Sequence, residues 1–153
     1  MAINPNTTFT TGQVLTAAQQ NRFGFGVVAL STVTSNTTVN TTEATRTSVT
    51  WTAIANRYYK ITWYEGTVVS GVNASLNNMY LRQTTTAGTI IGNSTLYIAS
   101  SEQEERICSV VTTFTAGSQT VFARVLSNAG TNTTYTASAT QPAFLLVEDI
   151  GPA

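Results

Sequence analysis

The sequence lacks most of the side chains that enzymes use for chemistry. It has no histidine and one cysteine, Cys108, and charged residues make up 9% of its 153 residues, against about 25% in an average domain. Histidine is the most common general acid or base near neutral pH, so its absence argues against most acid–base mechanisms. A single cysteine excludes an internal disulfide bond. No apolar run approaches the length of a transmembrane helix, and the amino terminus lacks a secretion-signal pattern. We therefore expect neither a transmembrane helix nor a cleavable secretion signal.

The charges of the chain are balanced, with seven basic and seven acidic residues. No basic patch is available to attract nucleic acid or an anionic membrane surface, so we expect neither partner. A net charge near zero favours association between proteins. The sequence therefore predicts a stable assembly in which neighbouring copies cover much of the surface.

Threonine is abundant, at about one residue in five, and it favours a pleated backbone over a helix. The clearest strand pattern runs from Ser48 to Val69. Apolar residues alternate with polar ones in both halves of this stretch, as expected for strands with one buried face; they are Val49, Trp51, Ala53, Tyr59, Ile61 and Trp63. We expect an antiparallel hairpin that turns at Asn56, which tolerates a positive φ, with Trp51 opposite Ile61. Its aromatic residues would form the core.

Shorter runs predict the other strands, and polar segments separate them. The expected strands cover residues 26–34, 77–83, 90–99, 107–114, 119–126 and 142–150. The expected connections are a loop or weak edge strand at 35–46, a loop at 70–76, a turn at 84–88, a solvated turn at 100–106 and a loop at 127–141, with a bulge or break at 92–94. About eight strands predict an all-β β-sandwich over residues 26–153.

Residues 1–25 differ from the rest and are interpreted as an extended amino-terminal arm. Thr16 to Asn21 predicts a short helix, because Thr16 and Gln19 have the spacing of a capping box. The arm has more apolar residues than a disordered tail; the candidate anchoring residues are Phe9, Val14, Leu15, Phe23 and Phe25. Two interpretations stay open: the arm folds back over its own sandwich, or it docks on a partner.

Acidic residues form two groups in the sequence, and neither predicts a catalytic or metal site. Glu102, Glu104 and Glu105 lie in one expected turn, but they lack the glycine and spacing of a calcium loop. Glu148 and Asp149 are adjacent in a strand, where side chains point to opposite faces. We expect solvated charges in both groups, no catalytic residues, no metal and no cofactor. Cys108 is expected to be a small buried hydrophobic residue.

Both ends of the chain resemble known virion proteins. The stretch from Thr8 to Asn21, TFTTGQVLTAAQQN, resembles the opening of structural proteins of tailed bacteriophages, including tail fibre and minor virion proteins. The stretch from Pro142 to Gly151, PAFLLVEDIG, is similar to their ending. The resemblance implies a virion protein, made in the host cytoplasm and displayed on the particle exterior.

The middle of the chain is similar to the C1q/TNF-like jelly roll. The similarity lies in the strands from Val49 to Ile61, the turn TAGSQ and the Phe144–Leu146 strand. It implies a jelly-roll-like sandwich that forms a homotrimer with aromatic residues along the threefold axis. Tyr58, Tyr64 and Tyr80 are the residues expected there, since polar-tipped aromatics suit interfaces.

These observations predict a non-enzymatic virion structural protein, either a capsid decoration or a tail fibre protein. Its arm would anchor it to other virion proteins of the capsid, collar or tail, and its β-sandwich would trimerise. The alternative is a receptor-binding or carbohydrate-binding module at a fibre tip. Loops 35–46, 70–76, 84–94 and 127–141, with Tyr135, would then contact a host surface glycan, because loops on a rigid sandwich are common binding sites.

Overall fold

The computed structural model describes residues 14, 23–71, 74–128 and 133–153. The described residues form ten strands and no helix. The strands are β1 (Gly26–Val33), β2 (Thr37–Val39), β3 (Ala44–Ala53), β4 (Arg57–Val69), β5 (Ser75–Gln83), β6 (Ile90–Ile98), β7 (Gln103–Thr113), β8 (Gly117–Ser127), β9 (Thr133–Thr136) and β10 (Ala143–Pro152). The all-β class predicted from the sequence is confirmed, and the expected helix at Thr16–Asn21 lies outside the described residues.

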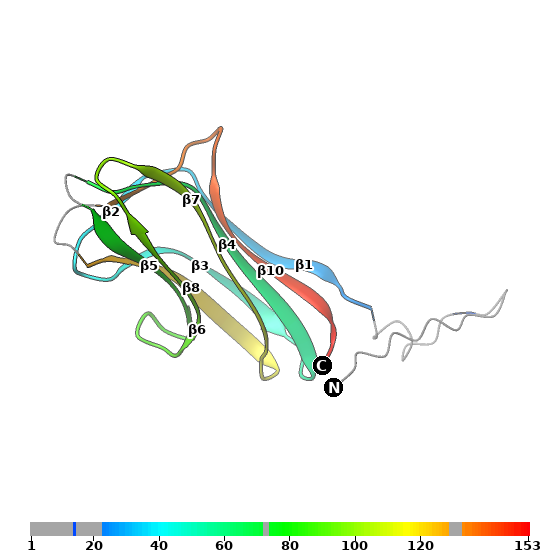
Figure 1. Cartoon of the computed structure of the whole chain (residues 1–153). Coiled ribbons are helices and arrows are strands. Elements are labelled where there is room, and N and C mark those ends of the chain that lie inside the picture. Colours follow the sequence, from blue (N-terminus) through cyan, green and yellow to red (C-terminus); the bar gives the residue numbers. More distant parts are fainter. Residues whose placement is uncertain (1–13, 15–22, 72–73, 129–132) are drawn as a thin grey trace.

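The strands form two sheets that face each other (Figure 1). Sheet A has β1, β10, β4 and β7 side by side, and the short strands β9 and β2 extend it beyond the end of β10. Sheet B has the order β3-β8-β5-β6. The chain passes repeatedly from one sheet to the other, and only β5 and β6 form a hairpin within a sheet. This arrangement among the described strands resembles a jelly roll.

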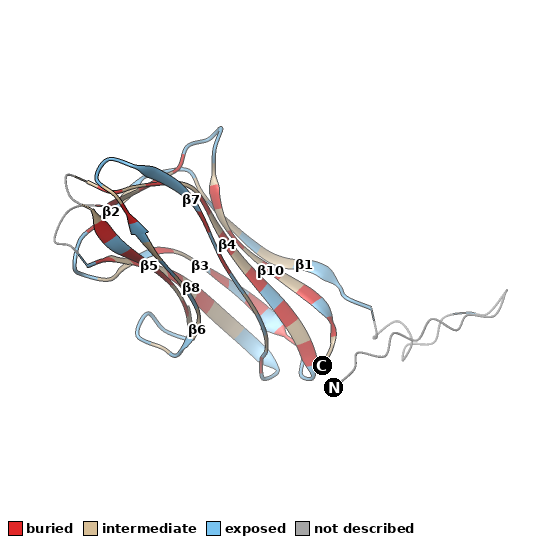
Figure 2. Ribbon diagram, in the orientation of Figure 1, coloured by how far each residue is buried: buried red, intermediate tan, exposed pale blue. Residues whose placement is uncertain are grey.

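The hydrophobic core lies between the sheets and is built from alternate residues of each strand. Figure 2 shows this alternation along β10, where buried residues are separated by more exposed ones. Trp51 and Phe114 meet edge to face with ring centroids 4.9 Å apart, and Tyr59 lies 5.8 Å from both rings. Trp63 is fully buried. The predicted aromatic core is therefore confirmed, including the inward position of Cys108.

The predicted hairpin between the halves of the Ser48–Val69 stretch is wrong. β3 pairs with β8, so that Trp51 lies opposite Gln119, whereas β4 pairs with β10 and β7. The two halves belong to different sheets and face each other across the core. The turn between them carries Asn56 at a φ of 57°, as the sequence predicts. Alternation alone shows which residues point inward, but not which sheet the strand joins.

Several predicted connections contain strands. β2 and β9 pair with each other within the expected loops 35–46 and 127–141, and the first of these agrees with the weak edge strand left open above. Residues 103–106 belong to β7 instead of a solvated turn. β6 continues through residues 92–94 as one strand, and its pairing with β5 shifts register next to Gly92, which agrees with the expected bulge. Gly92 faces the interior. A Cβ there would lie 3.3 Å from atoms of Leu81 and Val110, so this glycine permits close packing of β6 on its neighbours.

Candidate functional site

The outer face of sheet A is the largest group of exposed apolar side chains that the strands present. Its residues form rows across the four strands β7, β4, β10 and β1. One row joins Ile107, Tyr64, Phe144 and Thr32, and a second joins Ser109, Thr62, Leu146 and Leu30. We call this surface the apolar face. Its exposed large side chains include Val27 (60%), Leu30 (57%), Ile107 (54%), Val111 (53%) and Ile150 (42%).

The centre of the apolar face is an aromatic stack. Tyr64 and Phe144 are neighbours on β4 and β10, with ring centroids 5.2 Å apart and an angle of 22° between the rings. A third row, Val111, Lys60, Glu148 and Val27, carries one opposed pair of charges, with the Lys60 nitrogen 3.9 Å from a Glu148 oxygen. Glu105 is exposed on the same side of β7 as Ile107, so the face carries few charges. Large patches of this kind mark surfaces that bind another protein.

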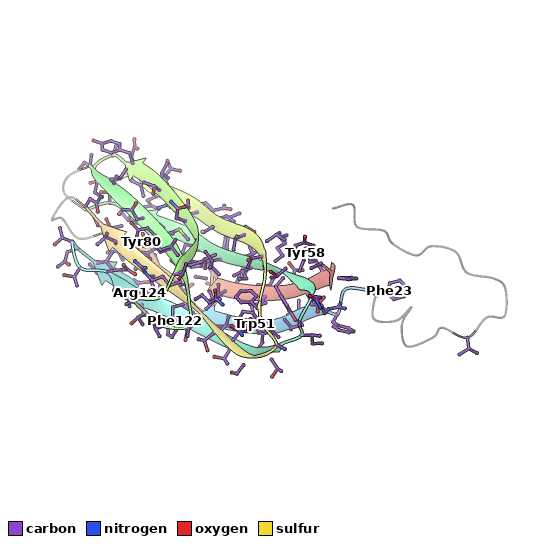
Figure 3. The ribbon with its side chains drawn as sticks, turned by 90° about the horizontal axis from the view of Figure 1, so that it is seen from below. Phe23, Trp51, Tyr58, Tyr80, Phe122 and Arg124 are labelled. Carbon is purple, nitrogen blue, oxygen red and sulfur yellow. The ribbon has the colours of Figure 1, made fainter. Side chains whose placement is uncertain are left out.

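The structure brings together two of the three tyrosines predicted for a trimer interface. Tyr58 and Tyr64 both lie on the outer side of β4, on the apolar face. Tyr80 lies on β5, on the outer side of sheet B, and Figure 3 shows Tyr58 and Tyr80 well apart from each other. One outer face of the sandwich therefore does not contain all three. The trimer interface stays a prediction for these residues.

The root of the arm is held by Arg57, a buried residue at the start of β4. Its guanidinium binds both carboxylate oxygens of Asp149, with N–O distances of 2.5 and 2.7 Å. It also donates to the carbonyl oxygen of Phe23 at 2.5 Å, and it lies 4.2 Å from the ring centroid of Phe25. We call these residues the arm clamp. Bidentate pairs of this kind fix direction as well as position.

The predicted anchoring residues have different positions. Val14 is 85% exposed, and Phe23 and Phe25 are about half exposed. Phe25 contacts Arg57, so this residue helps to hold the arm against its own sandwich. Phe9 and Leu15 lie outside the described residues. The anchoring role of the five residues stays a prediction.

Asp149 and Glu148 illustrate a partly wrong prediction. They point to opposite faces, as expected, but only Glu148 is on the outside. Asp149 is 2% exposed and accepts from Arg57 and from the backbone N–H of Gly151. The expectation of a solvated charge is therefore wrong for Asp149, because an arginine 92 positions away in the sequence neutralises it. Glu102, Glu104 and Glu105 are exposed, as predicted.

The two ends of the sandwich differ. One end, called the terminal end, carries Phe23, Ala153 and the β3–β4 turn; the backbone N–H of Ala153 donates to Asn56 at 2.8 Å. Figure 1 shows the carboxyl terminus beside this turn and the β7–β8 turn. The opposite loop end gathers the connections after β2, β4, β6 and β8. There the backbone N–H of Ser70 donates to the carbonyl oxygen of Glu102, and the backbone N–H of Ser127 donates to the carbonyl oxygen of Asn40.

This polarity divides the loops that the alternative function would use. The described parts of three of these loops, residues 35–46, 70–71, 74–76, 127–128 and 133–141, contribute to the loop end. The connection at 84–89 lies at the terminal end, where the backbone N–H of Thr84 donates to the carbonyl oxygen of Thr120. Tyr135 is fully buried, so it does not offer a surface contact. One continuous glycan site from all four loops is therefore excluded by the geometry.

Sequence reasoning missed the buried arginines. Arg46 pairs with Glu65 at 2.9 Å, and the side chains of both are fully buried. Arg106 is 3% exposed and donates to the Asn77 carbonyl and the Ser94 hydroxyl, while burial lowers the pKa of its guanidinium. The sequence signal that could have revealed them is their place in the strand alternation, where Arg46 and Arg106 occupy positions that point into the core.

The interior offers little reactive chemistry. Burial raises the pKa of the Cys108 thiol to about 11, so the thiol is protonated at neutral pH. Burial also raises the pKa of the Tyr135 hydroxyl. Among the described residues, no group of three or more His, Cys, Asp or Glu side chains is placed to hold a metal ion. No helix in that part of the chain is long and apolar enough to cross a membrane.

The described part of the chain is thus an all-β, two-sheet sandwich with an apolar outer face and a clamped arm root. No protein-family model and no curated protein matches the chain.

Three solved structures illustrate what the chain is similar to. A carbohydrate-binding module from Clostridium stercorarium in complex with cellobiose is 18% identical, covers 69% of this chain and 67% of its own, and has a TM-score of 0.29. The Eiger TNF from S. frugiperda is 11% identical, with coverages of 86% and 96% and a TM-score of 0.41. The infectious bursal disease virus Gt strain structure is 11% identical, with coverages of 81% and 38% and a TM-score of 0.42. Scores this low do not indicate a function.

Proposed function

We propose that the protein is a non-enzymatic structural protein of a tailed-bacteriophage virion. It would be an accessory, decoration or fibre protein that trimerises through its β-sandwich and is anchored to the capsid or tail by its amino-terminal arm. The observation that supports this proposal most is the apolar face of sheet A. The assignment to a virion rests on the resemblance of both ends of the chain to phage structural proteins.

A second copy of the chain is the occupant that best suits the apolar face. The opposite charges of Lys60 and Glu148 on this face neutralise each other. A face with so few charges repels a copy of itself only weakly, and Tyr58 and Tyr64 supply rigid aromatic surface with polar tips. Closed symmetric oligomers are the usual outcome of such contacts between identical chains. In a trimer the contact is heterologous, so the apolar face of each copy would pack against a different surface of the next copy around the threefold axis.

The clamp and the terminal end are consistent with an anchored particle protein. Arg57 fixes the point at which the arm leaves the sandwich. In a trimer, three arms would leave from equivalent positions, and attachment by several arms strengthens binding through effective concentration. The loop end would then point away from the particle.

A truncation tests the anchoring role. The chain should be cut after Arg22, because this preserves the contacts of Phe23 and Phe25 with Arg57. We expect the truncated protein to remain a folded trimer by light scattering and to lose co-sedimentation with particles that lack the protein. A truncated protein that fails to fold, or that still binds the particles, would contradict the anchoring role. A full-length protein that remains monomeric would contradict the trimer.

A further inference from the structure

The outer face of sheet B differs from the apolar face because it carries arginines beside aromatic rings. Tyr80 lies at its centre on β5, with Arg124 of β8 on one side and Asn93 of β6 on the other. Arg82 lies two residues further along β5, opposite Phe122 of β8. Figure 3 shows the labelled residues Tyr80, Arg124 and Phe122 in succession along this sheet. Rigid strands therefore carry all of these side chains.

The charged residues of this surface leave one positive charge in excess. Arg82 and Arg124 share a single carboxylate, that of Glu43, with Nε–Oε1 distances of 2.7 and 2.9 Å. The hydrogen bond from Arg82 lowers the pKa of Glu43, so the cluster holds two positive charges and one negative charge at neutral pH. Arg46 and Arg57, in contrast, each have a carboxylate of their own. Among the described residues, Arg106 also lacks a carboxylate partner, but it is buried, so the surplus positive charge at the surface of sheet B comes from Arg82 and Arg124.

The two guanidinium groups are held in place but have donors to spare. Arg82 also donates to the carbonyl oxygen of Gly88, and Arg124 donates to the hydroxyl of Thr45 and the carbonyl oxygen of Glu43. These bonds, with those to the Glu43 carboxylate, use three of the five N–H groups of each guanidinium within the described residues. Two N–H groups remain on each. Fixed arginines with spare donors suit a planar carboxylate.

Aromatic and uncharged polar side chains surround the arginines. The guanidinium carbon of Arg82 lies 5.4 Å from the ring centroid of Tyr80, and Phe122 is half-buried beside it. Asn93 and Thr95 are exposed on β6. Aromatic rings present a flat apolar surface with a polar edge, and amide and hydroxyl groups donate and accept hydrogen bonds. A sugar ring needs both kinds of contact, because one side of it is apolar and its rim is covered with hydroxyl groups.

We propose that this surface binds an acidic sugar of the hexuronic acid type. Its carboxylate would bind the spare N–H groups of Arg82 and Arg124, and its ring would lie against Tyr80, with Asn93 at the hydroxyl rim. One negative charge on the sugar matches one surplus positive charge on the protein. A surface on sheet B also stays open when the apolar face of sheet A is covered. This inference does not rest on the proposed virion function.

The experiment is calorimetric titration of the full-length protein with trigalacturonate and with its neutral counterpart, trigalacturonate methyl ester. We expect binding of trigalacturonate, at least about tenfold weaker binding of the methyl ester, and weakening by added salt. Arg124→Gln and Tyr80→Ala should each weaken binding of the acid about tenfold or more. The matched control is Gln141→Glu, which lowers the net charge by one at an exposed position between β9 and β10, outside both outer faces, and should leave the affinity unchanged. Thermal melting establishes that each variant is folded, and Arg124→Lys replaces Arg124→Gln if that variant unfolds, since it keeps the charge but loses the two-pronged donor.

Four results would overturn the inference. One is the absence of trigalacturonate binding at millimolar concentration. Equal affinity for the acid and its methyl ester is another, because the arginines would then play no part. Acetate binding with the same affinity as trigalacturonate would reduce the surface to a simple anion site. An equal loss of affinity in Gln141→Glu and Arg124→Gln would indicate attraction by net charge alone.

Discussion

Cys108 provides a direct test of burial at the level of one residue. Its side chain faces the core beside Arg106, and burial raises its pKa from 9.0 to about 11. The folded thiol therefore keeps its proton at pH values where the unfolded thiol has lost it. This contribution to stability is complete below pH 9 and is lost as the pH rises from 9 towards 11.

We therefore expect the free energy of unfolding to fall between pH 9 and pH 11, measured by urea denaturation at several pH values. The control is Cys108→Val, which should have a shallower decline over this range. Tyr135 titrates in the same direction, because burial raises its pKa as well, so the variant keeps a smaller slope near the upper limit. Rapid reaction of the native thiol with a thiol reagent at pH 8 would contradict the burial.

The pair of Arg46 and Glu65 shows how a charge can be tolerated inside this sandwich. Glu65 accepts from Nε and Nη2 of Arg46 at 2.9 and 3.1 Å and from the indole N–H of Trp63 at 2.9 Å. Arg46 in turn donates to the carbonyl oxygen of Ser35 and the hydroxyl of Thr37. Each charged group is thus hydrogen-bonded on several sides, which offsets the cost of removing it from water.

We expect Glu65→Leu alone to destabilise the protein by about 3–5 kcal/mol, since it leaves a buried guanidinium without its carboxylate. The double variant Arg46→Met with Glu65→Leu should recover most of this loss, because no unpaired charge remains. Chemical denaturation of the single and double variants measures both values. A double variant that is as unstable as the sum of the single variants would show that the pair does not act as a unit.

At the level of elements, the arm clamp joins β4, β10 and the chain that leads into β1. Replacing Arg57 with alanine leaves the buried carboxylate of Asp149 without its partner, and we expect a loss of about 3–5 kcal/mol. Phe25→Ala removes only the contact between the ring and the guanidinium, which is worth about 0.5–1 kcal/mol at a partly exposed site. In denaturation curves, the loss in the free energy of unfolding should therefore be severalfold larger for Arg57→Ala than for Phe25→Ala. Equal effects would mean that the ring, and not the carboxylate, fixes Arg57.

The sequence predicts the orientation of strand residues better than it predicts their partners. The alternation of Val49 and Trp51, and of Tyr59 and Ile61, correctly identifies inward positions, because one face of each strand must avoid water. It does not reveal that β3 pairs with β8, since pairing depends on segments about seventy residues apart. In the same way, alternation does not reveal that Tyr80 lies in sheet B while Tyr58 and Tyr64 lie in sheet A.

The parts of the candidate site that the sequence conceals are polar residues in buried positions. Arg46 lies in a segment rich in threonine and asparagine, and its partner Glu65 is 19 residues away, so neither local composition nor spacing marks the pair. Asp149 looks like a solvated carboxylate beside Glu148 until Arg57 is placed against it. Buried ion pairs depend on the complete fold, whereas hydrophobic alternation is visible within one strand.

For the whole molecule, the critical feature is the contrast between the outer faces of its two sheets. Ile107 and Val111 of the apolar face are each more than half exposed, and Tyr97 on the outer face of sheet B is 65% exposed. A lysine at any of these positions would be solvated in an isolated chain, so none should affect folding by more than about 0.5 kcal/mol. In an assembly that covers sheet A, a lysine at position 107 or 111 would instead be removed from water, at a cost of several kcal/mol.

We therefore expect Ile107→Lys and Val111→Lys to convert the trimer to monomers, measured by light scattering, while their melting transitions stay cooperative. Tyr97→Lys should leave the trimer intact. Because the three substitutions add the same charge to similarly exposed strand positions, dissociation by Tyr97→Lys alone would move the interface to sheet B and remove the surface proposed there for an acidic sugar.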